Sequence, residues 1–364
     1  MARARARSDS PTSPGRDRRS TRHRLLAGLA AGALAAGGLL AVGTTSASAD
    51  PGTATADTRI TVDSPAPRVG ASAVPAHAVT GYWQNFDNGA TVQTVAEVQD
   101  EYDIIAVAFA DATGQPGEVD FTLDPALGYS EEEFKADVAA KQAEGKSVII
   151  SVGGEKGNVS VGDGTAATNF ANSIVGLMDE YGFDGVDIDL ENGLNATYMT
   201  EALKSIHAEK SDVVVTMAPQ TVDMQSPENE YFKTALNIKD FLTVVNMQYY
   251  NSGSMIGCDG NVYSQGSVDF LTALACVQLE GGLDPSQVGL GTPASPSAAG
   301  SGYVEPGVVN DALDCLAKGE NCGSFTPDTT YPGIRGAMTW STAWDASNGN
   351  SWSSTVGPHV HGLP

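Results

Sequence analysis

Short apolar runs rich in β-branched residues recur along the chain between positions 79 and 340. Runs of this length and composition predict strands. Strands that are apolar almost throughout are typical of a parallel sheet buried on both faces. The predicted strands are Val79–Phe86, Asp103–Ala110, Ser147–Val152, Gly185–Leu190, Val213–Ala218, Leu242–Tyr249, Val288–Thr292 and Ile334–Trp340.

Stretches with helical patterning separate these runs. Eight strands that alternate with helices over about 265 residues predict a (β/α)8 TIM barrel of the α/β class. A doubly wound open sheet is the alternative, but the chain has no Gly-rich dinucleotide-binding fingerprint. We therefore predict a single catalytic barrel domain over residues 79–364. Predicted helices include Ala90–Glu101, Ser130–Glu144, Ala166–Tyr181, Asn195–Glu209, Ser267–Glu280 and Gly307–Lys318.

Polar and aromatic residues follow several of the predicted strands. In a barrel the carboxyl ends of all strands meet at one rim, where functional side chains are found. Barrel closure therefore predicts that segments far apart in the sequence lie together. These segments are Tyr82–Asn85, Ser151–Gly154, Ala218–Gln220, Gln248–Asn251 and Met338–Ser341.

The N-terminal segment has the pattern of an export signal. Eight arginines lie between Arg3 and Arg24, and an apolar Ala/Leu/Gly run and an Ala-Ser-Ala tripeptide lead to Asp50. We therefore expect a signal peptide over residues 1–49 and a secreted, extracellular protein. A membrane anchor is the alternative, which the Gly- and Ala-rich composition of the run disfavours. Residues 50–78, rich in Pro, Ala, Thr and Ser, predict a flexible linker.

The chain is strongly acidic. Residues 1–49 hold 8 of its 20 basic residues but 2 of its 44 acidic ones, so the remainder has a formal charge of about −30. A surface of this charge repels phosphate groups, so nucleic acid and anionic membranes are not expected partners. It suits a neutral substrate, and we expect a monomer.

Four cysteines remain after the signal segment: Cys258, Cys276, Cys315 and Cys322. An even number in an exported chain indicates two disulfides, although four cysteines allow three connectivities. We favour the pairs that are local in sequence, Cys258–Cys276 and Cys315–Cys322. A zinc site is the alternative, but the chain lacks a Cys-x-x-Cys pair.

The segment Gly182–Asn192 places acidic residues at every second position near its end. Asp187, Asp189 and Glu191 share one face of the predicted strand, because side chains alternate and residues two apart are about 6.6 Å apart. Crowding in a half-buried cleft disfavours full ionisation, so at least one acid is expected to stay protonated near neutral pH. We predict Glu191 as general acid, Asp189 as its partner, and Asp187 as the deeper group that tunes Asp189.

The acids allow two other interpretations. A hard divalent cation needs ligands from neighbouring strands, and no other acid or histidine ends one. A solvated acidic edge is disfavoured by the aliphatic residues between the acids. We therefore expect neither a metal nor another cofactor. Asp184 breaks the two-residue rhythm, and we predict that it orders the start of the strand.

The acids resemble the signature of glycoside hydrolase family 18, the chitinase family. Its pattern Asp-x-x-Asp-x-Asp-x-Glu is met by Asp184, Asp187, Asp189 and Glu191. The resemblance extends over residues 79–345 and describes a bacterial secreted type without the α+β insertion domain. A second family motif, Ser-x-Gly-Gly on the third strand, is met by Ser151, Gly153 and Gly154.

The resemblance implies retaining, substrate-assisted hydrolysis of β-1,4 bonds between N-acetylglucosamine units. Glu191 would protonate the glycosidic oxygen, and the acetamido oxygen of the substrate's own sugar would attack the anomeric carbon, giving an oxazolinium intermediate. Asp189 would orient the acetamido N–H. A tyrosine on strand six would hold the acetamido oxygen. Alignment of the polar residue after the tyrosine selects Tyr250, whereas alignment of Met247 selects Tyr249; we predict Tyr250.

Aromatic and amide side chains at the rim are predicted to bind the substrate. The resemblance implies that Trp340 stacks under the sugar next to the cleaved bond. Trp83 is a second candidate platform, because aromatic faces pack against the apolar faces of sugars. The remaining candidates are Tyr82, Gln220, Gln248 and Tyr249.

We therefore predict a secreted chitinase that cleaves chitin or N-acetylglucosamine oligosaccharides internally. About 40 residues separate predicted strands seven and eight, which leaves no room for the domain that deepens the cleft in some family members. A shallow, open groove favours endo cleavage. The alternatives are an endo-β-N-acetylglucosaminidase that acts on N-glycan cores and a non-catalytic chitin-binding lectin; the presence of Glu191 disfavours the lectin.

Overall fold

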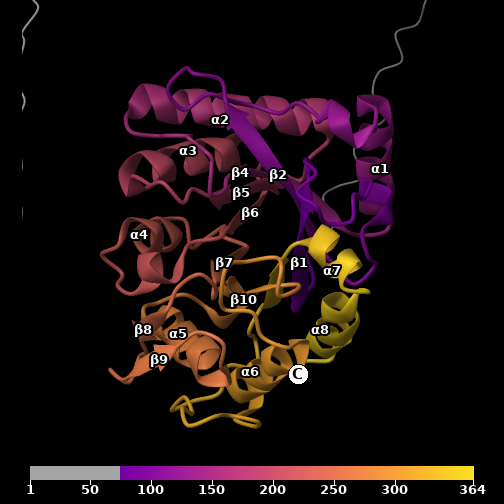
Figure 1. Ribbon diagram of the computed structural model, residues 1–364. Coiled ribbons are helices and arrows are strands. Elements are labelled where there is room, and N and C mark those ends of the chain that lie inside the picture. Colours follow the sequence, from indigo (N-terminus) through magenta and orange to yellow (C-terminus); the bar gives the residue numbers. More distant parts are fainter. Residues whose placement is uncertain (1–73) are drawn as a thin grey trace, which may run out of the picture. The chain divides into compact units, whose positions relative to one another are not determined.

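The computed structural model describes residues 74–364. Eight parallel strands form a closed barrel (Figure 1). The barrel is closed because β1 pairs with both β2 and β11. This is the (β/α)8 architecture that the sequence predicts, and all eight predicted strands are confirmed. The barrel strands are β1 (Ala78–Gln84), β2 (Ile104–Ala112), β4 (Ser147–Gly153), β5 (Gly185–Asp189), β6 (Val214–Met217), β7 (Val244–Gln248), β10 (Val288–Pro293) and β11 (Gly336–Trp340).

Helices surround the barrel and cover the outer face of its strands (Figure 1). Five of the predicted helices are confirmed within two residues at each end, and α4, α7 and α8 were not predicted. Side-chain caps define several starts: Ser130 and Glu133 form a reciprocal capping box at α1, and Asp163 caps α2. The helices are α1 (Glu131–Ala143), α2 (Gly164–Tyr181), α3 (Ala196–Glu209), α4 (Glu230–Asn237), α5 (Val268–Glu280), α6 (Pro306–Lys318), α7 (Thr342–Ser347) and α8 (Ser351–His361).

The predicted helix Ala90–Glu101 is wrong. One 3-10 turn, η1 (Val95–Glu97), forms in this segment. The carbonyl oxygen of Gln93 accepts a hydrogen bond from the indole Nε1 of Trp83 (2.9 Å), and the amide of Val95 donates to the Tyr129 hydroxyl (3.3 Å). Because tertiary partners take these backbone groups, they are not available for a regular helix.

The barrel wall separates two apolar cores. Outward-facing residues of the strands pack against the helices in a large core that includes Trp83, Val186 and Ile188. Inward-facing residues form a smaller core in the barrel interior that includes Tyr82, Ile149 and Met338. The two side-chain directions of each strand therefore meet different surroundings.

Smaller elements lie beside the barrel. The strand β3 (Val119–Asp120) pairs antiparallel with β2, and β8 (Ser254–Ile256) pairs with β9 (Val262–Ser264) in the connection from β7 to α5. Within the described residues, the connection from β10 to β11 contains α6 as its one regular element, so it carries no inserted α+β domain, as predicted.

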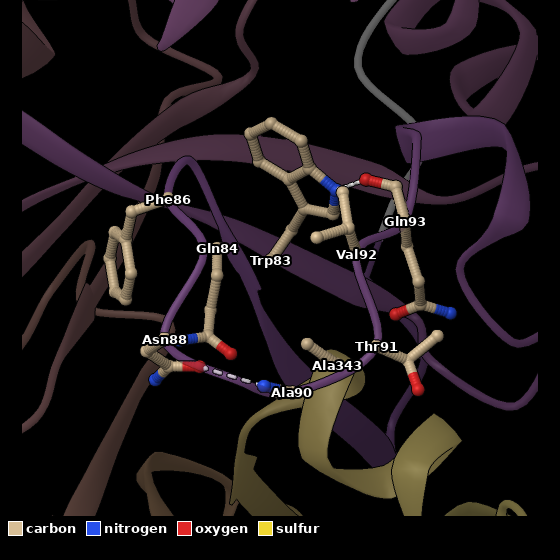
Figure 2. Close-up of a pocket in the computed structure, with 9 residues that line it drawn as sticks. All are labelled: Trp83, Gln84, Phe86, Asn88, Ala90, Thr91, Val92, Gln93 and Ala343. Atoms are coloured by element: carbon tan, nitrogen blue, oxygen red, sulfur yellow. Dashed lines mark hydrogen bonds between the residues drawn. The ribbon is translucent and has the colours of Figure 1, made fainter. Parts of the chain in front are cut away.

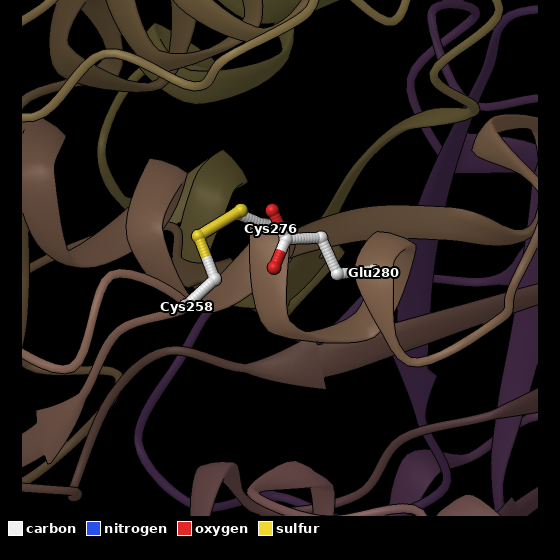
Figure 3. Close-up of side chains that lie close together, drawn as sticks. All are labelled: Cys258, Cys276 and Glu280. Atoms are coloured by element: carbon white, nitrogen blue, oxygen red, sulfur yellow. A yellow bond between two sulfur atoms is a disulfide. The ribbon is translucent and has the colours of Figure 1, made fainter.

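The two predicted disulfides are confirmed, with Cα–Cα distances of 5.7 Å for Cys258–Cys276 and 4.8 Å for Cys315–Cys322. Glu280 lies beside the first pair on α5 (Figure 3), and the three side chains form a potential ligand group for a metal. Both sulfur atoms are joined in the disulfide, so neither is a free thiolate.

The predicted signal peptide, residues 1–49, and the first 24 residues of the predicted linker lie outside the described residues. Within residues 74–364, no helix has both the length and the apolar character needed to cross a membrane.

Candidate active site

The end of β5 brings three acids to the interior face of the barrel. Asp187 is completely buried, and its carboxylate accepts three hydrogen bonds. The hydroxyls of Tyr82 (2.8 Å) and Ser151 (2.7 Å) donate to Oδ2, and the hydroxyl of Thr216 (2.6 Å) donates to Oδ1. These donors come from three other strands or strand ends, β1, β4 and β6, so barrel closure builds the cradle of Asp187.

Two glutamine amides connect the outer acids. Nε2 of Gln248 donates to Asp189 Oδ1 (2.8 Å) and lies 3.3 Å from Glu191 Oε1. Nε2 of Gln220 donates to Glu191 Oε2 (3.3 Å). Asp189 is 4% exposed, whereas Glu191 lies nearer the surface and is partly exposed. The three acids therefore run from the buried interior to the mouth of the barrel.

The surroundings raise the pKa of all three carboxyl groups. Burial raises the pKa of Asp187, although its three hydroxyl donors oppose this shift. Burial also raises the pKa of Asp189 well above its usual value, and the charges of Asp187 and Glu191 raise it further. For Glu191, burial raises the pKa and the hydrogen bond from Gln248 lowers it. A cluster of this kind retains protons that isolated carboxylates lose.

Gly153 and Gly154 allow two chain segments to approach each other closely. The amide of Gly154 donates to the carbonyl oxygen of Asp189 (2.6 Å). A Cβ atom at Gly153 would lie 2.1 Å from that same oxygen, and one at Gly154 would lie 2.7 Å from the ring of Phe109. Both glycines have positive φ, so a side chain at either position would disturb the backbone around Asp189.

The two tyrosines after β7 point to opposite sides of the barrel wall. Tyr250 lies among the acids: burial raises its pKa, and the charges of Asp189, Glu191 and Asp187 raise it further. Tyr249 instead packs against Phe270 of α5, and its hydroxyl accepts a hydrogen bond from Gln278 (3.2 Å). The structure therefore places Tyr250 in the site and contradicts the prediction of Tyr249 as a binding residue.

Aromatic side chains from three strand ends form one wall of the site. Trp340 is partly exposed, and its ring lies nearly parallel to that of Phe109, with ring centroids 5.8 Å apart. The ring centroids of Trp340 and Phe86 are 6.4 Å apart. The ring of Tyr82 is tilted against that of Trp340, with centroids 5.6 Å apart, and Tyr82 is 2% exposed. Tyr82 thus supports Asp187 and Trp340, which corrects its prediction as a direct substrate contact.

Residues 78–357 match the family model described as glycosyl hydrolases family 18. The chain belongs to this family. The match covers the whole barrel, from the first residue of β1 into α8, and includes the three acids of the site.

Relatives in this family carry chitinase names. Chitinase Chi52 of Paenibacillus xylanexedens is 36% identical, and the alignment covers 78% of this chain and 61% of that protein. Exochitinase 1 of Streptomyces olivaceoviridis is 34% identical, and the alignment covers 79% of this chain and 56% of that protein. The chain therefore spans less than two thirds of the length of these curated relatives. A solved structure from Streptomyces coelicolor, described as that of a candidate chitinase A, is 70% identical, with a TM-score of 0.79. The match covers 79% of this chain and 99% of that chain.

Trp83 does not belong to the site of this family 18 protein. It is 1% exposed and packs in the outer core against Phe134 (5.5 Å) and Tyr129 (6.2 Å). Figure 2 shows that its indole points away from the neighbouring Gln84 and donates to the carbonyl of Gln93. The predicted role of Trp83 as a sugar platform is therefore wrong.

Asp184, the first acid of the family motif, lies at the opposite end of β5. Its Oδ2 accepts hydrogen bonds from the amide of Val148 (2.8 Å) and from Nε2 of Gln142 (2.9 Å). It therefore joins the start of β5 to β4 and α1, the structural role that the sequence predicts.

Three residues of the site were not predicted from the sequence. Thr216 donates to Asp187, and Phe109 supports Trp340. The hydroxyl of Tyr231, on α4, accepts a hydrogen bond from the amide of Leu190 (2.5 Å) and so fixes the backbone next to Glu191. The alternation of side chains along β6 marks Thr216 as inward-facing, but no local signal identifies the other two.

Proposed function

We propose that this family 18 protein is a chitinase that hydrolyses β-1,4 bonds between N-acetylglucosamine units with retention of configuration. The observation that carries the proposal is the row of three acids at the end of β5, whose exposure increases toward the mouth of the barrel. Asp187 and Asp189 are buried, and Glu191 is partly exposed at the mouth. The chitinase names of relatives that are 34–36% identical support the substrate class.

Glu191 is the general acid and base of the proposed reaction. Its pKa is raised by burial, so the protonated form persists to higher pH than in an isolated glutamate. The proton passes from Glu191 to the glycosidic oxygen as the bond from that oxygen to the anomeric carbon breaks. The resulting carboxylate then accepts a proton from the water that opens the intermediate, which returns Glu191 to its starting state.

The nucleophile is the acetamido oxygen of the sugar on the non-reducing side of the cleaved bond. Its attack on the anomeric carbon forms an oxazolinium ring, in which the acetamido nitrogen carries positive charge. Asp189 is the carboxylate that accepts the acetamido N–H and offsets this charge, while Asp187 and Tyr250 complete the polar lining. Trp340 offers the partly exposed aromatic face beneath the ring.

Product analysis tests this mechanism. We expect proton NMR during hydrolysis of a chitin hexamer to show the β anomer first, and we expect fully deacetylated chitosan to stay intact because it lacks the internal nucleophile. Initial α product, or cleavage of chitosan at a comparable rate, would exclude substrate assistance.

Endo cleavage is the proposed mode, since the connection between β10 and β11 adds no domain to the side of the groove. The name of the Streptomyces olivaceoviridis relative indicates the opposite mode for that protein. A hexamer labelled at its reducing end distinguishes the two: endo cleavage yields labelled dimers, trimers and tetramers from the earliest times, whereas exo cleavage yields one labelled product.

Two other activities have distinct signatures. An endo-β-N-acetylglucosaminidase would release high-mannose glycans from glycopeptides and leave chitin oligomers uncut. A lectin would bind chitin with no turnover by the unmutated protein. Secretion is a further part of the proposal, and N-terminal sequencing of protein from the culture medium, with Asp50 as the expected first residue, tests it.

A further inference from the structure

A pocket opens on one side of Glu191, between the loop after β5 and the segment that joins β6 to α4. Glu191 itself lines the pocket, together with Leu194, Val222 and Asp223. Val222 is 53% exposed, so part of the wall is apolar and open to solvent. The pocket therefore adjoins the proposed proton donor and is accessible from outside.

The position of the pocket indicates which part of a substrate it receives. Trp340 and Tyr250, which lie beside the place proposed for the reacting sugar, do not line it. A general acid lies between the reacting sugar and the leaving group, because it protonates the oxygen that joins them. The pocket is lined by Glu191 but not by the aromatic residues beside the reacting sugar. It is therefore placed to receive the leaving sugar.

The wall of this leaving-sugar pocket is acidic. Glu228 and Glu230 line it beside Asp223. Lys233 lies 3.7 Å from Glu228 and 3.9 Å from Glu230, which partly balances these two charges. Within residues 74–364, no lysine, arginine or histidine lies within ion-pair distance of Asp223. Burial raises the pKa of Asp223, and its charge in turn raises the pKa of Glu191, which is consistent with their closeness.

We propose that the leaving-sugar pocket favours a glucosamine residue, whose free amino group is cationic, over N-acetylglucosamine, and that Asp223 is the specificity-determining residue. A carboxylate without a cationic partner, in a partly desolvated wall, attracts an ammonium group more strongly than it would in open water. The apolar side chains of Leu194 and Val222 are suited to the C–H face of the same ring. The inference rests on the proposed chitinase activity and names the substrate class that this activity prefers.

The two sides of the cleaved bond then carry opposite requirements. The reacting sugar must keep its acetyl group, because the acetamido oxygen is the nucleophile. The leaving sugar is preferred without it. The enzyme therefore cleaves partly deacetylated chitin mainly between an N-acetylglucosamine and the glucosamine that follows it.

Sequencing of product ends tests this selectivity. A chitosan with half of its residues acetylated at random is digested by the unmutated protein, and mass spectrometry identifies the residue at each new end. We expect N-acetylglucosamine at essentially all new reducing ends. At new non-reducing ends we expect a ratio of glucosamine to N-acetylglucosamine of about 3:1 where random cleavage gives 1:1, an enrichment of about threefold that matches the scale of an exposed to half-buried ion pair. Raising the salt concentration to 1 M should bring this enrichment close to one, because salt screens the attraction.

A pair of charge-neutralising variants assigns the selectivity to Asp223. Asp223→Asn should lower the enrichment to less than half of its original value. Asp240→Asn removes the same charge from an exposed site before β7, at the opposite end of the barrel, and should leave the enrichment unchanged. The salt experiment uses the unmutated protein, so it remains decisive if the Asp223 variant fails to fold.

The outcomes separate the two proposals. Random residues at the new non-reducing ends, with chitin still hydrolysed, would overturn the inference and leave the chitinase assignment intact. An enrichment that persists in 1 M salt and in Asp223→Asn would also overturn it. A protein that cleaves neither chitin nor the mixed polymer would refute the proposed function itself.

Discussion

The two faces of the barrel wall have different surroundings, although successive side chains of the same strands alternate between them. On β5, Asp187 and Asp189 face the interior and make polar contacts, whereas Val186 and Ile188 face the helices in a dry apolar core. The interior opens to solvent at the end of β5, where Glu191 is partly exposed. Within residues 74–364, the outward-facing side chains pack against the helices in the large core and make no direct contact with the acids.

The same contrast separates neighbouring aromatic residues. Tyr82 faces Asp187 while Trp83 lies in the outer core, and Tyr250 lies among the acids while Tyr249 contacts α5. Two of the three corrected aromatic assignments, those of Trp83 and Tyr249, concern residues of the outer face. Closeness to the rim in sequence is therefore not enough, and the direction of the side chain decides the role.

The largest expected effect comes from the last acid of the interior face. Glu191→Gln should lower kcat by at least about a hundredfold with little change in KM, because it removes the proposed proton donor and keeps the shape of the side chain. Steady-state kinetics on chitin oligomers measures this. The exposed control Glu201→Gln on α3 should leave both constants unchanged, and an unaltered rate in the Glu191 variant would contradict the assigned role.

The two tryptophans offer a direct test of the contrast. Trp83→Ala should lower the free energy of unfolding by about 3–5 kcal/mol, because it empties a filled site in the outer core, with little effect on the KM of the folded fraction. Trp340→Ala should raise KM about tenfold, equivalent to about 1.4 kcal/mol of binding, with a smaller loss of stability. Urea denaturation measures the free energy of unfolding, and initial rates give KM. A raised KM in Trp83→Ala together with a large loss of stability in Trp340→Ala would contradict the placement of Trp83 in the outer core and of Trp340 in the site.

Tyr250 and Tyr249 differ by one position and should differ in function. Tyr250→Phe should lower kcat about tenfold, since the hydroxyl proposed to hold the acetamido group is removed. Tyr249→Phe should keep kcat within about twofold and cost about 1 kcal/mol of stability, because Gln278 loses its partner. Equal loss of kcat in both variants would show that the interior location of Tyr250 has no special role.

Tyr231 reaches the site from the outer face through a single hydroxyl. Tyr231→Phe should lower kcat about threefold with KM unchanged, because the backbone amide before Glu191 loses its hydrogen-bond acceptor and the carboxyl group is held less firmly. Tyr181→Phe serves as the control. It removes a hydroxyl that donates a hydrogen bond to the carbonyl oxygen of Phe121, away from the acids. Identical kinetics of the Tyr231 variant and the unmutated protein would rule out this contribution.

The smallest effect concerns pH. In the proposed reaction Glu191 must be protonated to act, so kcat/KM should fall as pH rises through its raised pKa. The charge of Glu155 contributes to that rise, so Glu155→Gln should lower the pKa of Glu191 and move the alkaline limb to lower pH by a few tenths of a unit at low salt. A pH–rate profile measures the shift, and a movement to higher pH would contradict the sign.

Sequence patterns predicted the strands well because their apolar runs are continuous and local. The same patterns overpredicted a helix at Ala90–Glu101, where the indole of Trp83 and the hydroxyl of Tyr129 bind backbone groups from a distance. Tyr231 escaped prediction for a related reason. Its role depends on α4 lying against the end of β5, and no local spacing encodes that contact.

The sequence by itself determined the strands of the barrel and the acids at the end of β5, since each follows from periodicity or from neighbours along the chain. It favoured the two cysteine pairs, which the structure then confirmed. Tertiary structure alone decided that Tyr82, Ser151 and Thr216 converge on Asp187. It also decided that Trp83 is enclosed while Trp340 stays open. The reason is that hydrogen bonds and burial depend on distances in space, and only closure of the barrel fixes those distances between residues that are far apart in the chain.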